Sequence, residues 1–412
     1  MVVRRGLDVG ALRSHNAGLV LGLLRAAGPA GVSRLELAAG TGLTPQAVSK
    51  ITARLRAEGL VAEAGRRAST GGKPTTVLTL VPGAGHAVGL HLDRDEFRAV
   101  AVDLWGRVVA ERRGALDFEA GAAAVLPVAV RAVAGVRADP AVPASGLLGV
   151  GCAVPGPLDH RGGVLGRVTG ATAWEGFPLR AALTEALGAE VALDKDTNAA
   201  AVRLAAVLPP AVPPPATGAS TDPHAHPGAG PGPAPLPPAV TPGGDFVYVH
   251  LGTGLGAGIV LDGRSYRGPR GGAGEFGHQV LLLDGPPCRC GARGCVEALC
   301  LDAVDRGDEA GAARLLGEAT ANLVALLDVD RVVLGGRTLE AAAETYVSGV
   351  ARVLAARAPG PYRVPVALAP SGTVAAGAAE LVLAGLFTRP GPLPAPSPLH
   401  PNARADPAGS GP

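Results

Sequence analysis

The chain has 412 residues, 47% hydrophobic and 17% charged, which suits a folded protein of two or three domains and excludes general disorder. No run approaches eighteen consecutive apolar residues, and the N-terminus lacks the apolar core of a signal peptide, so we expect neither a membrane span nor secretion. The net charge of +2 hides an asymmetry, because residues 1–80 hold eleven Lys and Arg against four Asp and Glu. We therefore expect a cytoplasmic protein with a basic N-terminal module.

The first eighty residues predict three short helices and a β-hairpin. Apolar residues recur at helical spacing over 17–27, Ser33 and Glu36 form a capping box for a second helix, and Thr44 begins a third. The segment 59–80 reads as a basic hairpin. This order is typical of a winged helix-turn-helix, whose second motif helix enters the major groove of double-stranded DNA. A small helical protein-interaction domain is the alternative. The candidate DNA contacts are Gln46, Ser49, Lys50, Arg54, Arg66, Arg67 and Lys73.

From Ala87 onward, short apolar strands alternate with helices rich in Ala and Leu, which indicates an α/β fold. The segment 209–244 holds thirteen prolines and reads as a spacer inserted in this body. We expect a DNA-binding domain over 1–82, an α/β body over 83–387 and a disordered Pro-rich tail over 388–412. The strands are expected over 87–92, 98–103, 147–153, 191–194, 246–251, 256–261 and 331–334, and the helices over 120–137, 179–188, 310–327 and 340–357.

Three cysteines lie within eight residues and follow a histidine, which is a pattern of metal ligands. Cys288, Cys290 and Cys295 with His278 provide three thiolates and one imidazole, the ligand set of a closed, structural Zn²⁺ site. Three reduced cysteines in a loop are the alternative interpretation. The remaining cysteines, Cys152 and Cys300, have apolar neighbours and are expected to be buried.

Several motifs in chain order resemble those of the ROK family, which unites bacterial sugar-responsive repressors and sugar kinases. Gly274-Glu-Phe-Gly-His278 followed by the cysteine loop and Glu297 carries most of the resemblance. The other matching segments are 69–74, 154–159, 196–201, 251–258 and 333–336. The resemblance implies a winged helix followed by a two-lobed, actin-like ATPase fold with a sugar in the cleft between the lobes.

The resemblance also implies functional residues. The family's sugar contacts correspond here to Asp196, Glu275, His278 and Glu297, and Asp196 would be the general base if kinase activity survives. Carboxylates accept hydrogen bonds from sugar hydroxyls, and a positioned carboxylate can take a proton. The zinc loop would hold His278 and Glu297 beside the sugar.

One segment departs from the family's kinases. Those enzymes carry a glycine-rich Asp-x-Gly-Gly-Thr-Lys segment that cradles the ATP phosphates. Here the stretch is His91-Leu-Asp-Arg-Asp-Glu96, which has no glycine and gains carboxylates. Since phosphoryl transfer depends on positioning and charge neutralisation, we expect neither ATP as a cofactor nor enzymatic activity.

The sequence thus predicts a transcriptional regulator, a repressor of genes for carbohydrate uptake or catabolism that responds to a sugar effector. It would bind its operator as a homodimer or homotetramer. One alternative is a kinase for a hexose or N-acetylhexosamine that retains a DNA-binding head. A DNA-bound scaffold without an effector is the other, because Gly170 stands where the family has a sugar-contacting Asn and the segment between Glu297 and Asp305 is short.

Overall fold

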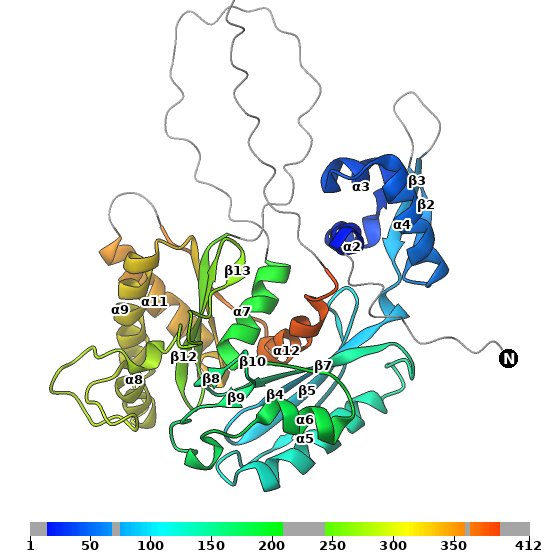
Figure 1. The fold of residues 1–412 in the computed structure, drawn as a ribbon. Helices are drawn as coiled ribbons and strands as arrows, with labels where there is room; N and C mark the ends of the chain where they lie inside the picture. Colours follow the sequence, from blue (N-terminus) through cyan, green and yellow to red (C-terminus); the bar gives the residue numbers. More distant parts are fainter. Residues whose placement is uncertain (1–14, 68–74, 209–243, 359–362, 388–412) are drawn as a thin grey trace, which may run out of the picture.

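The computed structural model describes residues 15–67, 75–208, 244–358 and 363–387. The predictions for Lys73, for almost all of the Pro-rich segment 209–244 and for the tail 388–412 lie outside these residues. The described chain forms a small N-terminal head and a larger α/β body built around two five-stranded sheets (Figure 1). Among the helices of the described residues, none has the length and apolar character needed to cross a membrane.

The head follows the predicted order of helices and hairpin. Its caps form as expected, because the Ser33 hydroxyl accepts the Glu36 N–H, the Glu36 carboxylate accepts the Ser33 N–H, and Thr44 accepts the N–H of Ala47. Gly42 ends the second helix in the left-handed conformation. A three-stranded sheet in the order β1-β3-β2 packs against the helices. The elements are α2 (His15–Ala27), β1 (Val32–Ser33), α3 (Arg34–Thr41), α4 (Pro45–Ala57), β2 (Val61–Arg67) and β3 (Thr75–Leu80).

The first lobe of the body is a mixed sheet in the order β10-β7-β4-β5-β6, with the first three strands parallel. Val88, Leu90 and Leu92 alternate along β4 toward a core shared with α5 and α6. The elements are β4 (His86–Leu92), β5 (Glu96–Asp103), β6 (Val108–Ala115), α5 (Ala122–Arg137), β7 (Leu147–Val154), β8 (Leu158–Asp159), β9 (Val164–Leu165), α6 (Leu179–Leu187) and β10 (Val191–Lys195).

The second lobe repeats this plan around a sheet in the order β13-β12-β11-β14-β15. The expected helix over 340–357 is divided, because Ala342 leaves helical geometry between α10 and α11. The elements are β11 (Phe246–Leu251), β12 (Leu255–Leu261), β13 (Arg264–Ser265), α8 (Val296–Asp305), α9 (Glu309–Leu327), β14 (Arg331–Gly335), α10 (Arg337–Ala341), α11 (Ala343–Arg357) and β15 (Val366–Leu368).

The periodicity did not predict α8, nor α7 (Asp196–Val207) and α12 (Thr373–Leu383), and the last two lie between the two sheets (Figure 1). They pack on each other, with α12 also on β4 and β7 and α7 on β11 and β12. The approach is close because small residues line it. A Cβ added to Gly89 of β4 would lie 2.0 Å from the carbonyl oxygen of Ala375 in α12.

This close approach gives the first prediction. Gly89→Ala forces α12 away from β4, and we expect a loss of about 1–3 kcal/mol in the free energy of unfolding, typical of an overpacked core. Thermal unfolding measures it as a fall in Tm of several degrees. Gly83→Ala is the control, since no atom lies within 4 Å of the added Cβ. Equal Tm values for the two variants would contradict the packing described.

Candidate functional site

A cleft between the two lobes brings together the four predicted sugar contacts. Asp196, Glu275, His278 and Glu297 all line it. They come from different elements: the start of α7, the loop after β13, a 3₁₀ turn over Phe276–His278, and the first turn of α8. Residues spread over a hundred positions of sequence therefore lie around one polar cavity.

Asp196 is the first residue of α7 and is half-buried. One of its carboxylate oxygens accepts the N–H of Thr197 at 2.6 Å, which fixes the side chain at the rim of the cleft. The positive end of the helix dipole favours a negative charge at this position. The geometry therefore holds a hydrogen-bond-accepting group against the cavity.

Glu275 is held by a lysine that the sequence analysis missed. The Lys195 side chain is only 4% exposed, and its ammonium lies 2.8 Å from Glu275 Oε1 and donates to the carbonyl of Ala273 at 2.8 Å. Lys195 directly precedes Asp196 at the end of β10. That adjacency was the one available signal, but the sequence does not show that the chain from 273 to 275 folds back onto this strand end.

Glu297 supports the cleft from the other side. Its Oε2 atom accepts the N–H of Leu255 at 2.8 Å, which ties the start of α8 to the glycine-rich turn between β11 and β12. Gly252 and Gly254 belong to this turn and Gly256 follows in β12, and the last two of these glycines line the cleft together with Glu297. The carboxylate thus positions the turn and also faces the cavity.

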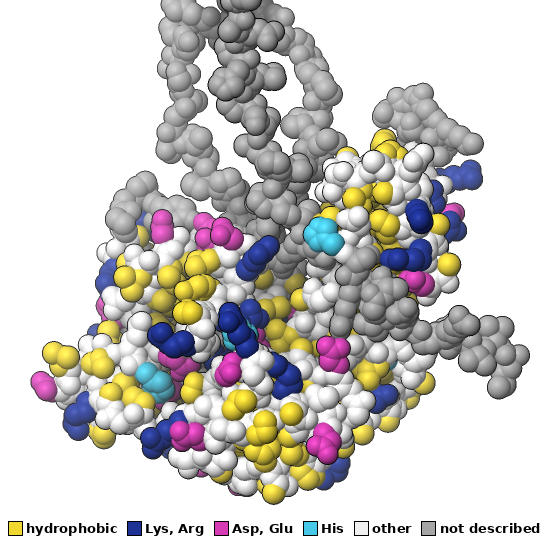
Figure 2. Space-filling model, in the orientation of Figure 1, with side chains coloured by type: hydrophobic (Ala, Val, Ile, Leu, Met, Phe, Trp, Pro, Cys, Tyr) yellow, Lys and Arg dark blue, Asp and Glu magenta, His cyan; other side chains and the backbone are white. Residues whose placement is uncertain are grey.

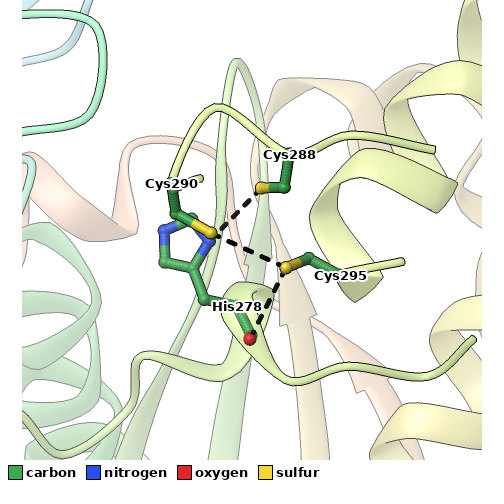
Figure 3. Close-up of side chains that lie close together, drawn as sticks. All are labelled: His278, Cys288, Cys290 and Cys295. Atoms are coloured by element: carbon green, nitrogen blue, oxygen red, sulfur yellow. Dashed lines mark hydrogen bonds between the residues drawn. The ribbon is translucent and has the colours of Figure 1, made fainter. Parts of the chain in front are cut away.

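The predicted metal ligands form a compact cluster (Figure 3). Ligand atoms of His278, Cys288, Cys290 and Cys295 all lie within 4.8 Å of one another. Burial raises the pKa of the Cys295 thiol to about 12, whereas the amide N–H of Ala292 lowers the pKa of Cys290. A cation would be required to hold all three sulfurs as thiolates, because metal binding displaces their protons.

The donor set and the distances fit a tetrahedral metal. With metal–sulfur bonds of about 2.3 Å, tetrahedral geometry separates two sulfurs by about 3.8 Å. The Cys290 and Cys295 sulfurs lie 3.7 Å apart, and Cys288 Sγ lies 3.7 Å from His278 Nδ1. Because Nδ1 faces the sulfurs, Nε2 is the imidazole nitrogen left for a ligand in the cleft, which His278 also lines. The cluster could therefore hold a structural metal and orient His278.

The other end of the cleft is formed by the segment 91–96, where the sequence predicted that the glycine-rich phosphate cradle is lost. This segment carries carboxylates. Asp93 is buried at the tip of the β4–β5 hairpin and accepts hydrogen bonds from the Arg94 N–H at 2.8 Å and the Thr253 hydroxyl at 3.3 Å. Burial would raise its pKa, but His91 and His250 beside it bring the pKa below its usual value. Burial lowers the pKa of His91. At neutral pH this hairpin therefore presents a negative charge beside a neutral imidazole.

The head presents a polar face on α4. Gln46, Ser49, Lys50 and Arg54 are all exposed, whereas Val48, Thr52 and Leu55 are buried on the opposite side. Lys and Arg side chains are visible over this part of the head (Figure 2). The predicted DNA contacts on α4 thus share one accessible surface.

The predicted contacts on the hairpin are placed differently. Arg66 is exposed on β2, but Arg67 pairs with Glu36 at 2.9 Å and donates to the carbonyls of Ala30 and Gly31. Arg67 therefore anchors the hairpin to the start of α3. Lys73 lies outside the described residues.

Comparisons with known proteins agree with this geometry. Residues 243–304 match the model of the ROK family. The chain is 26% identical to the xylose repressor of Bacillus subtilis over 269 residues, which cover 65% of this chain and 61% of the repressor. It thus spans about three fifths of the length of the curated relatives it matches.

Two solved structures are similar. One, the crystal structure of a ROK family transcriptional regulator described as a homolog of E. coli MLC protein, is 20% identical. Its TM-score is 0.67, with 91% of this chain and 96% of that chain covered. The other, a ROK hexokinase from Thermus thermophilus, is 28% identical with a TM-score of 0.51 and covers 72% of this chain and 97% of its own. The body therefore has the kinase-like fold of these ROK proteins, and the likeness to the regulator extends over the N-terminal head.

Proposed function

We propose that this chain, whose residues 243–304 match the model of the ROK family, is a sugar-responsive transcriptional regulator, a repressor of genes for carbohydrate uptake or catabolism. The observation that carries the proposal is the composition of the cleft. Its sugar side keeps Asp196, Glu275, His278 and Glu297, while its phosphate side carries Asp93 in a segment, 91–96, without glycine. A cleft of this kind binds a sugar without transferring phosphate to it.

The head supplies DNA binding in this proposal. Helix α4 would enter the major groove, with Gln46 and Ser49 at base edges and Lys50 and Arg54 toward phosphates. Arg66 and Lys73 would meet the phosphate backbone, and Arg67 would act mainly by holding the hairpin against α3. We assign residues 1–82 to this domain and 83–387 to the sugar-binding body. One small head provides limited specific affinity, so a homodimer or homotetramer acting on cytoplasmic DNA is the expected form.

Sugar recognition would use hydrogen bonds to several hydroxyl groups. Asp196 and Glu297 offer carboxylate oxygens, and the imidazole edge of His278 that faces away from the sulfurs offers a nitrogen. Lys195 neutralises part of the negative charge through Glu275, which lowers the cost of gathering three carboxylates around one cavity. A neutral, polyhydroxylated ligand fits these groups better than an anion.

The hairpin that stands in place of the phosphate cradle opposes ATP through its backbone and through Asp93. A triphosphate placed beside β4 and β5 would meet the Asp93 carboxylate and Glu96, in a pocket that Arg98, Arg113 and Arg337 also line, with Arg337 paired to Asp95. No glycine lies between His91 and Glu96, so side chains keep the backbone amides from approaching a phosphate as they do in a glycine-rich cradle. The retained glycines at 252, 254 and 256 would then serve the packing of the turn against Glu297.

A second candidate, a sugar kinase with a DNA-binding head, is favoured by one observation. Asp196 stands at the rim of the cleft where a general base is needed, and the second glycine-rich turn is still present. A coupled assay for sugar-dependent ADP release with hexoses and N-acetylhexosamines separates the two functions. The regulator proposal predicts a rate equal to that of Asp196→Asn, and a rate abolished by this substitution would instead establish the kinase.

For the metal cluster we propose a structural Zn²⁺. Three thiolates and an imidazole are the donor set that zinc prefers, and with four protein ligands the site is closed to substrate. Its role would be to fix the loop from His278 to Glu297 and thereby the orientation of two cleft residues.

Metal content tests this assignment. We expect one zinc ion per purified chain, and we expect Cys290→Ser to lower the bound zinc several-fold and to reduce Tm. Elemental analysis and thermal unfolding measure the two effects. Cys300→Ser is the control, since Cys300 lies outside the cluster and its hydrogen bond to the Ala312 carbonyl suits a hydroxyl. Full zinc content in Cys290→Ser would contradict the assignment.

DNA binding is tested by fluorescence anisotropy on the DNA upstream of the gene itself, with competitor DNA. Lys50→Ala should weaken binding and reduce the slope of log K against log salt by about one, as expected for one lost phosphate contact. Gln46→Ala should relax sequence preference at one base pair by about 1–3 kcal/mol. Arg314→Ala on α9 of the body, also exposed, is the matched control. If all three variants bind like the wild type, α4 is not the DNA-reading helix.

Effector control is tested by repeating the titration with D-xylose, D-glucose, N-acetylglucosamine and N-acetylmannosamine. At least one sugar should change the Kd for DNA about fivefold or more, within the usual range of allosteric coupling. Asp196→Asn should remove this response and leave the Kd without sugar unchanged, whereas Asp302→Asn on the exposed side of α8 should keep it. A DNA affinity that no sugar alters would favour the scaffold interpretation.

A further inference from the structure

A buried carboxylate joins the head to the body. Glu380 of α12 is only 2% exposed, and its two oxygens lie 2.5 and 2.8 Å from the two terminal nitrogens of Arg25 in α2. This bidentate arrangement fixes the angle as well as the distance between the two helices. The residues are 355 positions apart, so the contact is between domains rather than within one element.

The same carboxylate also contacts the body's other central helix. Arg203 of α7 lies 3.4 Å from Glu380 Oε2, the oxygen that Arg25 approaches at 2.8 Å. A Cβ added to Gly106 would fall 2.4 Å from a nitrogen of Arg203 and 2.5 Å from one of Arg25. The two guanidinium groups therefore pack over one glycine, with Glu380 between them as a shared counter-charge.

The surroundings make this arrangement sensitive to displacement. Arg25 also packs over the ring of Phe387 at 4.6 Å, and Leu24 of α2 belongs to one apolar cluster with Leu383 and Leu386. A charge buried in such surroundings is costly unless it is paired, so a shift of either arginine changes the environment of the other. Arg25 of the head and Arg203 of α7 thus pair with the same carboxylate.

Helix α7 connects this point to the cleft. Asp196 is its first residue and lines the cleft, and Arg203 follows about two turns later on the same helix. A rigid helix transmits a displacement at one end to the other. A ligand that draws Asp196 therefore moves Arg203 relative to Glu380.

We propose that Glu380 is a positioning residue for the DNA-binding head. We propose also that the pairing of its one carboxylate with both Arg25 and Arg203 couples the cleft to the head. The coupling rests on the proposed function, whereas the positioning of the head does not. When Arg203 moves closer to the Glu380 carboxylate, the hydrogen bonds from Arg25 to the same carboxylate weaken and α2 is held less firmly. The head then leaves its DNA-competent orientation more readily.

Hydrogen exchange on the full-length, ligand-free protein tests the positioning of the head. In Arg25→Gln, amides of α2 should exchange about tenfold faster or more, while those of β11 keep their wild-type rates and show that the body is folded. The buried Glu380 stays paired with Arg203 in this variant. Arg357→Gln is the matched control, an exposed arginine paired with Glu318 far from the head. Wild-type exchange in α2 of Arg25→Gln would overturn the proposal.

The coupling is tested in the same experiment at α7. In Arg25→Gln, Arg203 is the remaining arginine paired with Glu380, so amide exchange in α7 should slow about threefold. This effect should vanish when Arg203→Gln is also present. Unchanged or faster exchange in α7 of Arg25→Gln, or an equal effect in both backgrounds, would overturn the coupling. If α2 and α7 respond as expected but no sugar changes DNA affinity, the proposed function fails and the positioning role of Glu380 stands.

Discussion

The close packing of α12 is the constraint on which the rest of the structure depends. This helix lies on β4 and β7 of the first lobe, crosses α7, and pairs with α2 of the head. The approach requires small residues, since a Cβ on Gly89 would clash with Ala375 and one on Gly377 would lie 2.1 Å from the carbonyl of Ala199 in α7. With no room for side chains at these crossings, a displacement of one helix must be taken up by its neighbours. The two lobes and the head are therefore mechanically linked through one helix.

The cleft beside this helix has two chemically different ends. At the sugar end, Asp196, Glu275 and Glu297 are each fixed by a hydrogen bond or ion pair, so the acceptors are oriented before a ligand arrives. At the other end, Asp93 is buried in a segment without glycine, and Arg98, Arg113 and Arg337 line the same pocket. A kinase needs both ends, whereas a sugar-controlled regulator needs only the first. Our proposal of ligand sensing rather than phosphoryl transfer thus rests on the missing glycines at 91–96.

Much of the fold was predictable because local rules decide it. The caps at Ser33 and Thr44 and most of the strands follow from side-chain chemistry and apolar runs, and the structure confirms them. Helices α7 and α12 were missed, because Ala, Gly and Val on nearly every face leave no amphipathic pattern in a helix buried on all sides. In the cleft, the motif predicted the residues that the fold brings together. Lys195 and the Arg25–Glu380 pair depend on long-range contacts that no local pattern encodes.

The central claim is that the cleft retains a sugar site and has lost its nucleotide site. Calorimetric titration tests this claim most directly, with one protein preparation titrated with sugars and with the Mg²⁺ complex of a non-hydrolysable ATP analogue. The account predicts saturable heat with at least one of the sugars, absent in Asp196→Asn, and no saturable heat with the nucleotide at millimolar concentration, with or without sugar. Stoichiometric binding of the nucleotide, or nucleotide binding that a sugar strengthens, would contradict the account and show that the hairpin at Asp93 still admits a triphosphate.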